Sequence, residues 1–170
     1  MQLTEPQVTA VVAAAKVGAP GNPEFAIGAV TPDGEVIANP LAGMTESEVR
    51  ALDRPAREKV ARQVSVLRGA KPPVPLAGQT AIVVDDGLAT GLTAMAAVRY
   101  LKRQGASVVL AVPIAARDSA KRLAAEADRL VVVSIPDSFA AVGQFYERFG
   151  QTEDAQVREL LGTAGRTPED

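Results

Sequence analysis

The sequence contains no cysteine and no histidine, and aromatic residues make up only 4% of its 170 positions. These absences exclude thiol nucleophiles, Cys/His zinc sites, Ser-His-Asp triads and histidine acid-base chemistry. A composition dominated by alanine and valine, with few aromatic rings, favours close packing of helices on a parallel sheet. A chain of this length can bury such a core as about one domain, without disulfides or structural metals.

Charged residues are balanced and dispersed. Eighteen basic and 20 acidic residues give a net charge of -2, and no stretch concentrates lysine or arginine as a nucleic-acid footprint would. The first residues lack the basic start of a signal peptide, and the apolar run from Val8 to Ala15 is too short to span a bilayer. We therefore expect a cytoplasmic protein without nucleic-acid or membrane partners.

Two features of the first forty residues indicate β-structure. The nearly continuous apolar run from Val8 to Lys16 predicts a buried strand, followed by a rigid loop over the Gly- and Pro-rich residues 18–23. The Asp33-Gly34 pair between two apolar runs predicts a hairpin over residues 25–38.

A polar helix is expected from Thr45 to about Leu67, because Thr45 and Glu48 have the spacing of a capping box, and Pro55 is expected to interrupt it. Its many arginine and glutamate residues suit a solvated cover. As a whole, we expect a single domain over residues 1–162, with a cover insertion at about 32–79 and a disordered tail at 163–170.

From Thr80 onward the pattern becomes regular. Strands are expected over residues 80–84, 107–112 and 129–135, and they alternate with helices over 93–104 and 118–127. Such alternation with short loops is the signature of right-handed βαβ units, so the predicted fold class is α/β with a Rossmann-like parallel sheet. Two further helices are expected over residues 139–149 and 153–161.

The segment from Ala81 to Thr93 carries the strongest chemical signal. Four apolar residues place Asp85 and Asp86 at the carboxyl end of a strand, the edge where open parallel sheets bind ligands. The residues that follow are mostly small or hydroxylic and lead into a helix, so backbone amides converge there on a site for an anion. Those residues are Gly87, Leu88, Ala89, Thr90, Gly91, Leu92 and Thr93. The two carboxylates are suited to bind vicinal hydroxyls or a Mg²⁺ ion. The alternative interpretation is that they belong to an ordinary turn after a strand and bind no ligand.

This segment resembles the phosphoribosyl-diphosphate motif of the type I phosphoribosyltransferases. The resemblance implies a glycosyltransferase of nucleotide metabolism in which Asp85 and Asp86 hold the ribose hydroxyls and residues 87–93 wrap the 5-phosphate. It also implies Mg²⁺, held by the two acids directly, through water or through the ribose hydroxyls. Enzymes of this family that act on 6-oxopurines carry an aspartate where this sequence has Ala89, so hypoxanthine and guanine are disfavoured.

A second resemblance covers nearly the whole chain. Residues 16–30 and 139–149 look like a bacterial group of phosphoribosyltransferases with unassigned substrate. By this resemblance Lys16 contacts diphosphate and Phe139 stacks on a base. The alternative interpretations are that Lys16 is an ordinary surface residue and that Phe139 packs into the core. Three nearby residues have structural interpretations: Asp137 as a helix cap, and Tyr146 and Phe149 as core residues.

The sequence departs from that group at its start. Members begin with a further helix and a strand that ends in a Leu-Pro-Arg-Gly-Gly loop for diphosphate, whereas this sequence begins downstream and has Ala15 before Lys16 where the group has an Arg-Lys pair. Fewer groups would then stabilise the leaving diphosphate. In the related group this first strand would lie beside residues 80–84, and without it the backbone groups on that side would be unpaired. We therefore expect the other strands to re-pair, or a second subunit, as in a homodimer, to cover this edge.

Three functions follow. The first is Mg²⁺-dependent transfer of ribose 5-phosphate from phosphoribosyl diphosphate to a nitrogenous base, and the second is a catalytically impaired protein that binds phosphoribosyl diphosphate or a nucleoside monophosphate as a regulator. The third is a phospho-accepting receiver domain, because Asp85 and Asp86 also resemble its acid pair. It is disfavoured because the later strands end at Val112-Pro113 and Ile135-Pro136, without the required aspartate and lysine.

Overall fold

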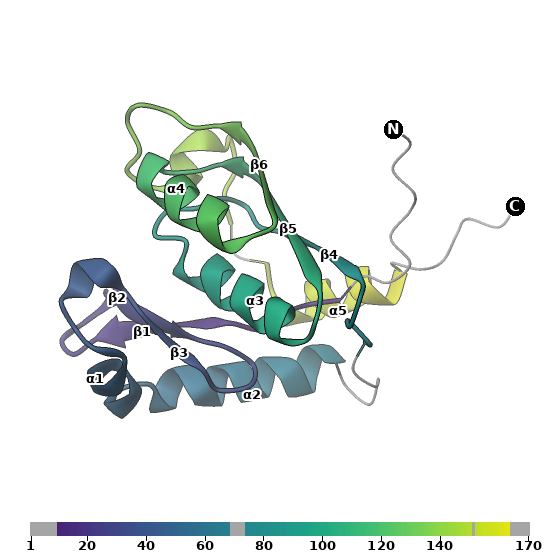
Figure 1. Cartoon of the computed structure of the whole chain (residues 1–170), viewed down its shortest axis with the longest axis horizontal. Coiled ribbons are helices and arrows are strands. Elements are labelled where there is room, and N and C mark those ends of the chain that lie inside the picture. Colours follow the sequence, from purple (N-terminus) through teal and green to yellow (C-terminus); the bar gives the residue numbers. More distant parts are fainter. Residues whose placement is uncertain (1–9, 69–73, 151, 164–170) are drawn as a thin grey trace, which may run out of the picture.

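The computed structural model describes residues 10–68, 74–150 and 152–163, and Figure 1 shows how its elements are arranged. In chain order the elements are β1 (Ala15–Ala19), β2 (Asn22–Val30), β3 (Val36–Ala38), the 3-10 turn η1 (Pro40–Ala42), α1 (Glu46–Ala51), α2 (Arg54–Arg68), β4 (Thr80–Val84), α3 (Leu92–Arg103), β5 (Ser107–Ile114), α4 (Arg117–Glu126), β6 (Arg129–Ser134), the 3-10 turn η2 (Val142–Phe145) and α5 (Asp154–Thr163). None of the described helices is long and apolar enough to cross a membrane.

The described strands form two sheets with helix α3 between them. Strands β1-β2-β3 make an antiparallel sheet, and β4-β5-β6 make a parallel one. Helix α3 contacts β4 and β5 on one side and β1, β2 and β3 on the other, while α1 and α2 cover the outer face of the antiparallel sheet. Helix α4 lies beside α3 and against β6, as Figure 1 shows.

The main core lies where α3 meets the two sheets. Val108 and Leu110 of β5 are fully buried against α3, whose Ala96 and Val98 are fully buried as well. The alternating burial along β5 follows the two-residue period of a strand. A second core cluster, which includes Val36 and Val49, fills the space between the antiparallel sheet and helices α1 and α2.

The parallel βαβ pattern predicted from Thr80 onward is confirmed, with element ends shifted by one or two residues. The N-terminal strand prediction is wrong in its boundaries. Residues 10–14 form no regular element, Val8 and Thr9 lie outside the described residues, and β1 begins at Ala15. The expected rigid loop is instead a two-residue turn, because Ala19 pairs with Asn22 across an antiparallel ladder. An apolar run alone does not say which of its residues will pair, and here pairing begins where the run ends.

The hairpin around Asp33-Gly34 is confirmed, with β2 paired to β3. The capping box is also confirmed, since Glu48 N–H donates to Thr45 Oγ1 and Thr45 N–H to Glu48 Oε2. The expected break at Pro55 falls earlier, after Ala51. Proline is tolerated in the first turn of α2 because amides there have no intrahelical acceptor. The helix is also more than a solvated cover, since Val49 and Val60 are buried.

The predicted helix over residues 139–149 is wrong, because only the short turn η2 forms there. Aromatic rings organise this segment instead. The ring centroids of Phe139 and Phe145 lie 5.4 Å apart, and those of Tyr146 and Phe149 lie 5.3 Å apart. Asp137, expected to cap that helix, instead accepts a hydrogen bond of 2.8 Å from Arg117 Nη2. The last helix is confirmed as α5, and residues 164–170 of the expected tail lie outside the described residues.

The face of the parallel sheet that points away from α3 is apolar and open in this chain. Ile82, Val84 and Val133 expose 60%, 75% and 83% of their surface. Parallel sheets normally have both faces covered. The other described strands do not re-pair with β4, because they form a separate sheet. The expectation that a second subunit covers this region remains a prediction.

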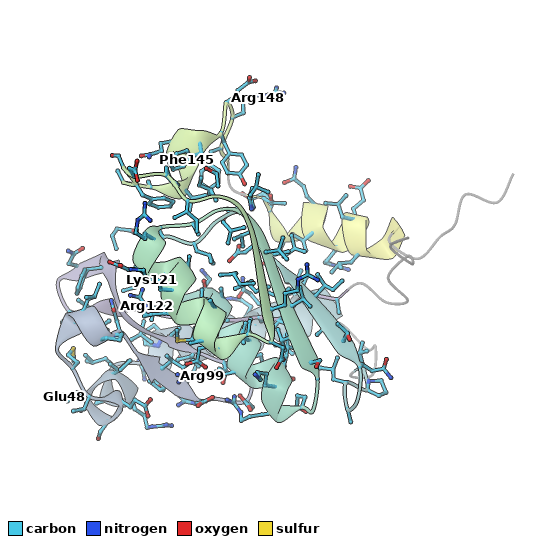
Figure 2. The ribbon with its side chains drawn as sticks, turned by 45° about the horizontal axis from the view of Figure 1, so that its top comes forward. Glu48, Arg99, Lys121, Arg122, Phe145 and Arg148 are labelled. Atoms are coloured by element: carbon cyan, nitrogen blue, oxygen red, sulfur yellow. The ribbon has the colours of Figure 1, made fainter. Side chains whose placement is uncertain are left out.

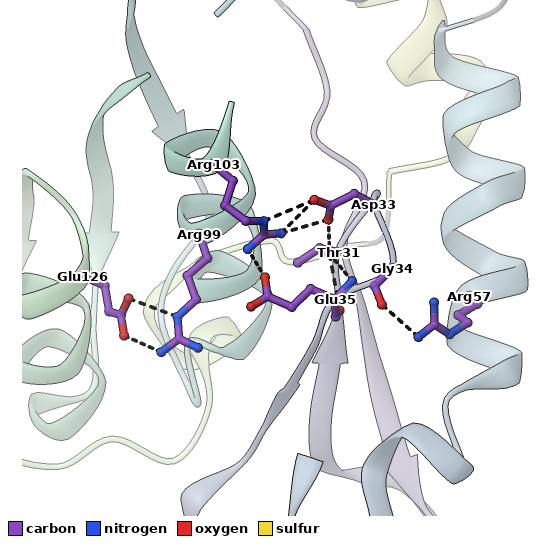
Figure 3. Close-up of polar contacts among 8 residues, drawn as sticks. All are labelled: Thr31, Asp33, Gly34, Glu35, Arg57, Arg99, Arg103 and Glu126. Carbon is purple, nitrogen blue, oxygen red and sulfur yellow. Dashed lines mark hydrogen bonds and ion pairs between the residues drawn. The ribbon is translucent and has the colours of Figure 1, made fainter. Parts of the chain in front are cut away.

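Ion pairs fix α3 against its neighbours, as Figure 3 shows. Arg103 at the end of α3 donates to both carboxylate oxygens of Asp33, at 2.9 and 3.0 Å, and also pairs with Glu35 in the β2–β3 turn. From the other side of that turn, Arg57 donates to Gly34 O at 2.8 Å. The turn is therefore held between α3 and α2.

A second pair joins α3 to α4. Arg99 donates through Nε and Nη2 to the two carboxylate oxygens of Glu126, at 3.1 and 2.6 Å. This forked hydrogen bonding holds the pKa of Glu126 below its usual value. Helix α3 is thus tied to the antiparallel sheet at its C-terminus and to α4 in its middle.

Gly28 allows β2 to approach β3 and α1 closely. A Cβ atom at Gly28 would lie 2.6 Å from both Ile37 O and Val49 Cγ1. We therefore expect Gly28→Ala to lower the free energy of unfolding by about 3 kcal/mol, measured by urea denaturation, since the backbone carbonyl cannot give way. The control is Gly150→Ala, whose added Cβ meets nothing within 4 Å. Equal stability of both variants and the wild type would contradict this packing.

Candidate functional site

The candidate site begins where β4 ends. Strand β4 stops at Val84, so Asp85 and Asp86 lie at the carboxyl edge of the parallel sheet. The chain then crosses to α3, whose N-cap is Gly91 with φ at 70°. A side chain at Gly91 would be strained in this left-handed conformation, and its Cβ would lie 2.8 Å from Leu123 Cδ1 of α4. The predicted strand-loop-helix arrangement is therefore confirmed, and residues 87–91 are called the loop below.

The loop is hydrogen-bonded to β5 through one amide, and to α4 and the residue before it through its carbonyl oxygens. Leu88 N–H donates to Ile114 O at 3.0 Å, and Leu88 O accepts from Ala116 N–H at 2.8 Å. Ala89 O accepts from the Ser119 hydroxyl, and Thr90 O accepts from Arg122 Nη2 at 3.0 Å. Three consecutive carbonyls are therefore bonded to α4 or to the residue before it.

The backbone amides show the opposite pattern. Among the described residues, no protein acceptor is bonded to the amide N–H groups of residues 89–94, and the helical ladder begins with Met95 N–H donating to Gly91 O at 2.8 Å. These donors include the orphan amides that every helix N-terminus leaves. Together with the helix dipole, they favour an anion at this position.

The two acids differ in their surroundings. The Asp85 carboxylate is half-buried and accepts a hydrogen bond of 3.0 Å from Asp86 N–H, whereas Asp86 is exposed. Burial is the main cause that raises the pKa of Asp85, and the neighbouring charge of Asp86 adds to it against the hydrogen bond from the Asp86 amide. A carboxylate held at such a position gains from a ligand that donates hydrogen bonds to it.

The segment after β6 lies against the acids. Tyr146 donates its hydroxyl proton to Asp86 O at 2.6 Å. A Cβ on Gly87 would lie 2.8 Å from Val142 Cγ1, so this segment also covers the start of the loop. The prediction of Tyr146 and Phe149 as core residues is wrong, because they are 37% and 52% exposed. The aromatic content of the segment was visible in the sequence, but its contact with Asp86 depends on a turn that helical spacing did not indicate.

Ser119 and Arg122 had no signal in the sequence that would mark them as site residues. Both lie on α4 at positions that suit an ordinary amphipathic helix. Ser119 is 2% exposed, and Figure 2 labels Arg122 on α4 beside Lys121. Only the fold shows that these side chains meet the loop.

Lys16 and Phe139 are not bonded to the loop by any polar contact in the described part of the chain. Lys16 Nζ donates to Glu24 Oε2 at 2.9 Å across the β1–β2 hairpin, and this pair lowers the pKa of Glu24. Phe139 lies after β6 and contacts the ring of Phe145. Their expected contacts with diphosphate and with a base therefore remain predictions.

A metal would have few protein ligands here. No cluster of three or more acidic, histidine or cysteine side chains that could hold a metal occurs in the described ranges. Asp85 and Asp86 fit Mg²⁺ only if water or ligand oxygens complete the octahedron, which is how Mg²⁺ is commonly held beside phosphates.

Comparison with known proteins shows the family of this chain. Residues 7–149 match the model of the "Phosphoribosyl transferase domain" family. The chain belongs to this family. Its α/β architecture, with the parallel sheet and the helices on it, is that of the type I phosphoribosyltransferases.

Relatives of this phosphoribosyl transferase domain occur in two strains of Mycobacterium tuberculosis, CDC 1551 / Oshkosh and H37Rv. Each is named "Putative phosphoribosyl transferase" and is 39% identical over 161 residues, which cover 92% of this chain and 36% of the relative. The chain thus spans about a third of the length of these curated relatives. The crystal structure of TT1426 from Thermus thermophilus superposes with a TM-score of 0.71 at 37% identity, covering 91% of this chain and 76% of that one.

The raised pKa of Asp85 gives a stability prediction. Its folded-state pKa lies above the unfolded value of about 3.9, so the protonated form favours folding, and this contribution is lost as the pH rises through the folded-state pKa. We expect Asp85→Asn to have a higher Tm than the wild type at pH 7, since the amide oxygen still accepts from Asp86 N–H. The difference should shrink as the pH falls towards about 4. A variant with a lower Tm at neutral pH would contradict this.

Proposed function

We propose that this domain binds the ribose 5-phosphate group of phosphoribosyl diphosphate or of a nucleoside monophosphate, and transfers it between diphosphate and a nitrogenous base. One observation carries the proposal. Six successive amides, from Ala89 to Ala94, have no protein acceptor in the described chain, and they begin three residues after the second of two carboxylates at the carboxyl edge of the sheet. The amides suit the phosphate and the acids suit the sugar.

The two ends of the ligand would meet groups of opposite character. The 5-phosphate would accept hydrogen bonds from the loop and the α3 N-terminus, with the hydroxyls of Thr90 and Thr93 adding donors. The ribose hydroxyls would donate to Asp85 and Asp86, which relieves the cost of keeping Asp85 charged when half-buried. Mg²⁺ would supply charge stabilisation for the leaving diphosphate when bound.

The base would lie near the segment after β6. Phe139 and Phe145 already form an aromatic pair there, and Tyr146 joins this segment to Asp86 O. A planar base can stack on such rings. Ala89 lies where the family's 6-oxopurine enzymes carry an acid, so we propose a base other than hypoxanthine or guanine.

A second function is binding of the same ligands without transfer, as a regulatory protein. The observation that favours it is the ion pair between Lys16 and Glu24, which engages the side chain expected to meet diphosphate. Calorimetry with ribose 5-phosphate, a nucleoside monophosphate and phosphoribosyl diphosphate measures binding, and an assay of diphosphate release with added bases measures transfer. Binding without release for any base would support the regulator, and release would support the transferase.

Asp86→Ala should weaken ribose 5-phosphate about tenfold or more, because a charged acceptor of hydroxyl protons is lost, while the exposed position leaves the Tm nearly unchanged. Calorimetry checks the affinity. The control is Glu58→Ala, which removes an exposed carboxylate on α2 whose ion pair with Arg54 is 3.7 Å long. Affinity equal to that of the control would count against the role of Asp86.

Thr90→Val should lower the affinity for ribose 5-phosphate about fivefold with little change in the affinity for free ribose, because only the phosphate loses a hydrogen-bond donor. Thr90→Ser keeps the hydroxyl and serves as the matched control. Equal losses for both ligands would show that Thr90 acts on the sugar or on the fold instead.

A further inference from the structure

The loop has an outer side, which faces α4, and an inner side, which faces away from it. In a trans peptide unit the C=O of one residue and the N–H of the next point in opposite directions within one plane. No cis peptide bond occurs in the described chain. The direction of each loop amide is therefore set by whatever holds the carbonyl before it.

Three consecutive peptide units of the loop are held in this way. Leu88 O is bonded to Ala116 N–H, Ala89 O to the Ser119 hydroxyl, and Thr90 O to Arg122 Nη2. The N–H groups of residues 89, 90 and 91 must then point away from α4. The first of these bonds is made by backbone, but the second and third depend on two side chains.

Those two side chains form one connected unit. Arg122 Nη2 donates to Ser119 Oγ at 3.1 Å as well as to Thr90 O at 3.0 Å, and the Ser119 hydroxyl directs its own proton towards Ala89 O. Ser119 is 2% exposed, so a water molecule has little room to replace its hydroxyl. Without these donors the two carbonyls could rotate, and their amides would rotate with them.

We infer that Ser119 and Arg122 are positioning residues, which orient the amides of Thr90 and Gly91 towards the phosphate by holding the carbonyls of Ala89 and Thr90 against α4. This inference rests on the proposed function, since it assumes that the loop binds the phosphate. It assigns to α4 a part in ligand binding although neither side chain touches the ligand. Arg122 acts here through a carbonyl rather than as a counter-charge.

The test compares four variants with the wild type by calorimetry against inorganic phosphate, ribose 5-phosphate and free ribose. Arg122→Met removes both donors and the charge while keeping most of the stem, and Ser119→Ala removes the hydroxyl. Arg122→Lys restores one donor. Lys121→Met is the matched control, because it removes the same charge from the neighbouring, exposed residue on α4.

We expect Arg122→Met and Ser119→Ala each to lower the affinity for inorganic phosphate and for ribose 5-phosphate about fivefold to tenfold. The affinity for free ribose should stay nearly unchanged. Arg122→Lys should recover part of the loss, and Lys121→Met should bind like the wild type. If Ser119→Ala fails to fold, the half-exposed Arg122 still carries the test.

Four results would overturn the inference. If Arg122→Met and Ser119→Ala both bind the phosphate ligands with wild-type affinity, the two residues have no positioning role, although the proposed function is unaffected. Equal weakening by Lys121→Met would show a general effect of charge, and equal weakening of free ribose would show a structural role only. A wild-type protein that binds neither phosphate ligand would overturn the proposed function together with this inference.

Discussion

The structure depends on helix α3 being packed on both sides. One side meets the parallel sheet and the other meets the antiparallel sheet, so this one helix joins the two halves of the domain. Contact on both sides buries most of the helix, and the buried side chains include the small Ala94, Ala96 and Ala97. The ion pairs from Arg99 and Arg103 then fix the helix along its axis. Its N-terminus, where the loop amides gather, is consequently a fixed position in the molecule.

The same constraint explains how the site is divided among distant segments. The acids come from the end of β4, the amides from the loop and α3, the donors to the loop carbonyls from α4, and the hydroxyl on Asp86 O from Tyr146. Each element is placed by the sheet or by α3. A phosphate site built from backbone amides needs such support, because the amides have no side chains of their own to lock them in place.

The sequence was sufficient for those parts of the fold that have strict periodicity. Strands and helices from Thr80 to Ser134 appeared within one or two residues of their predicted ends, because hydrophobic period, short loops and glycine positions all agreed. The position of the loop and of the two acids before it could be predicted for the same reason. The capping box at Thr45 and the Asp33-Gly34 hairpin are local signals, and both were confirmed.

The parts that sequence reasoning missed depend on tertiary contacts. Whether the apolar residues before Lys16 pair as a strand is decided by β2, and the segment over 139–149 avoids a helix while its rings pack on one another. The roles of Ser119 and Tyr146 arise from carbonyls that only the folded chain brings near. Hydrogen bonds between a side chain and a distant backbone group leave no periodic trace in a sequence.

The central claim is that the unpaired amides of residues 89–94 form the phosphate site. The most direct test is a titration of the ¹⁵N-labelled protein with ribose 5-phosphate, followed by amide chemical shifts in NMR spectra. We predict that the largest saturable shifts fall on the amides of residues 89–94, with smaller ones at Asp85 and Asp86. Shifts confined to other parts of the chain, or none at saturating ligand, would contradict the account.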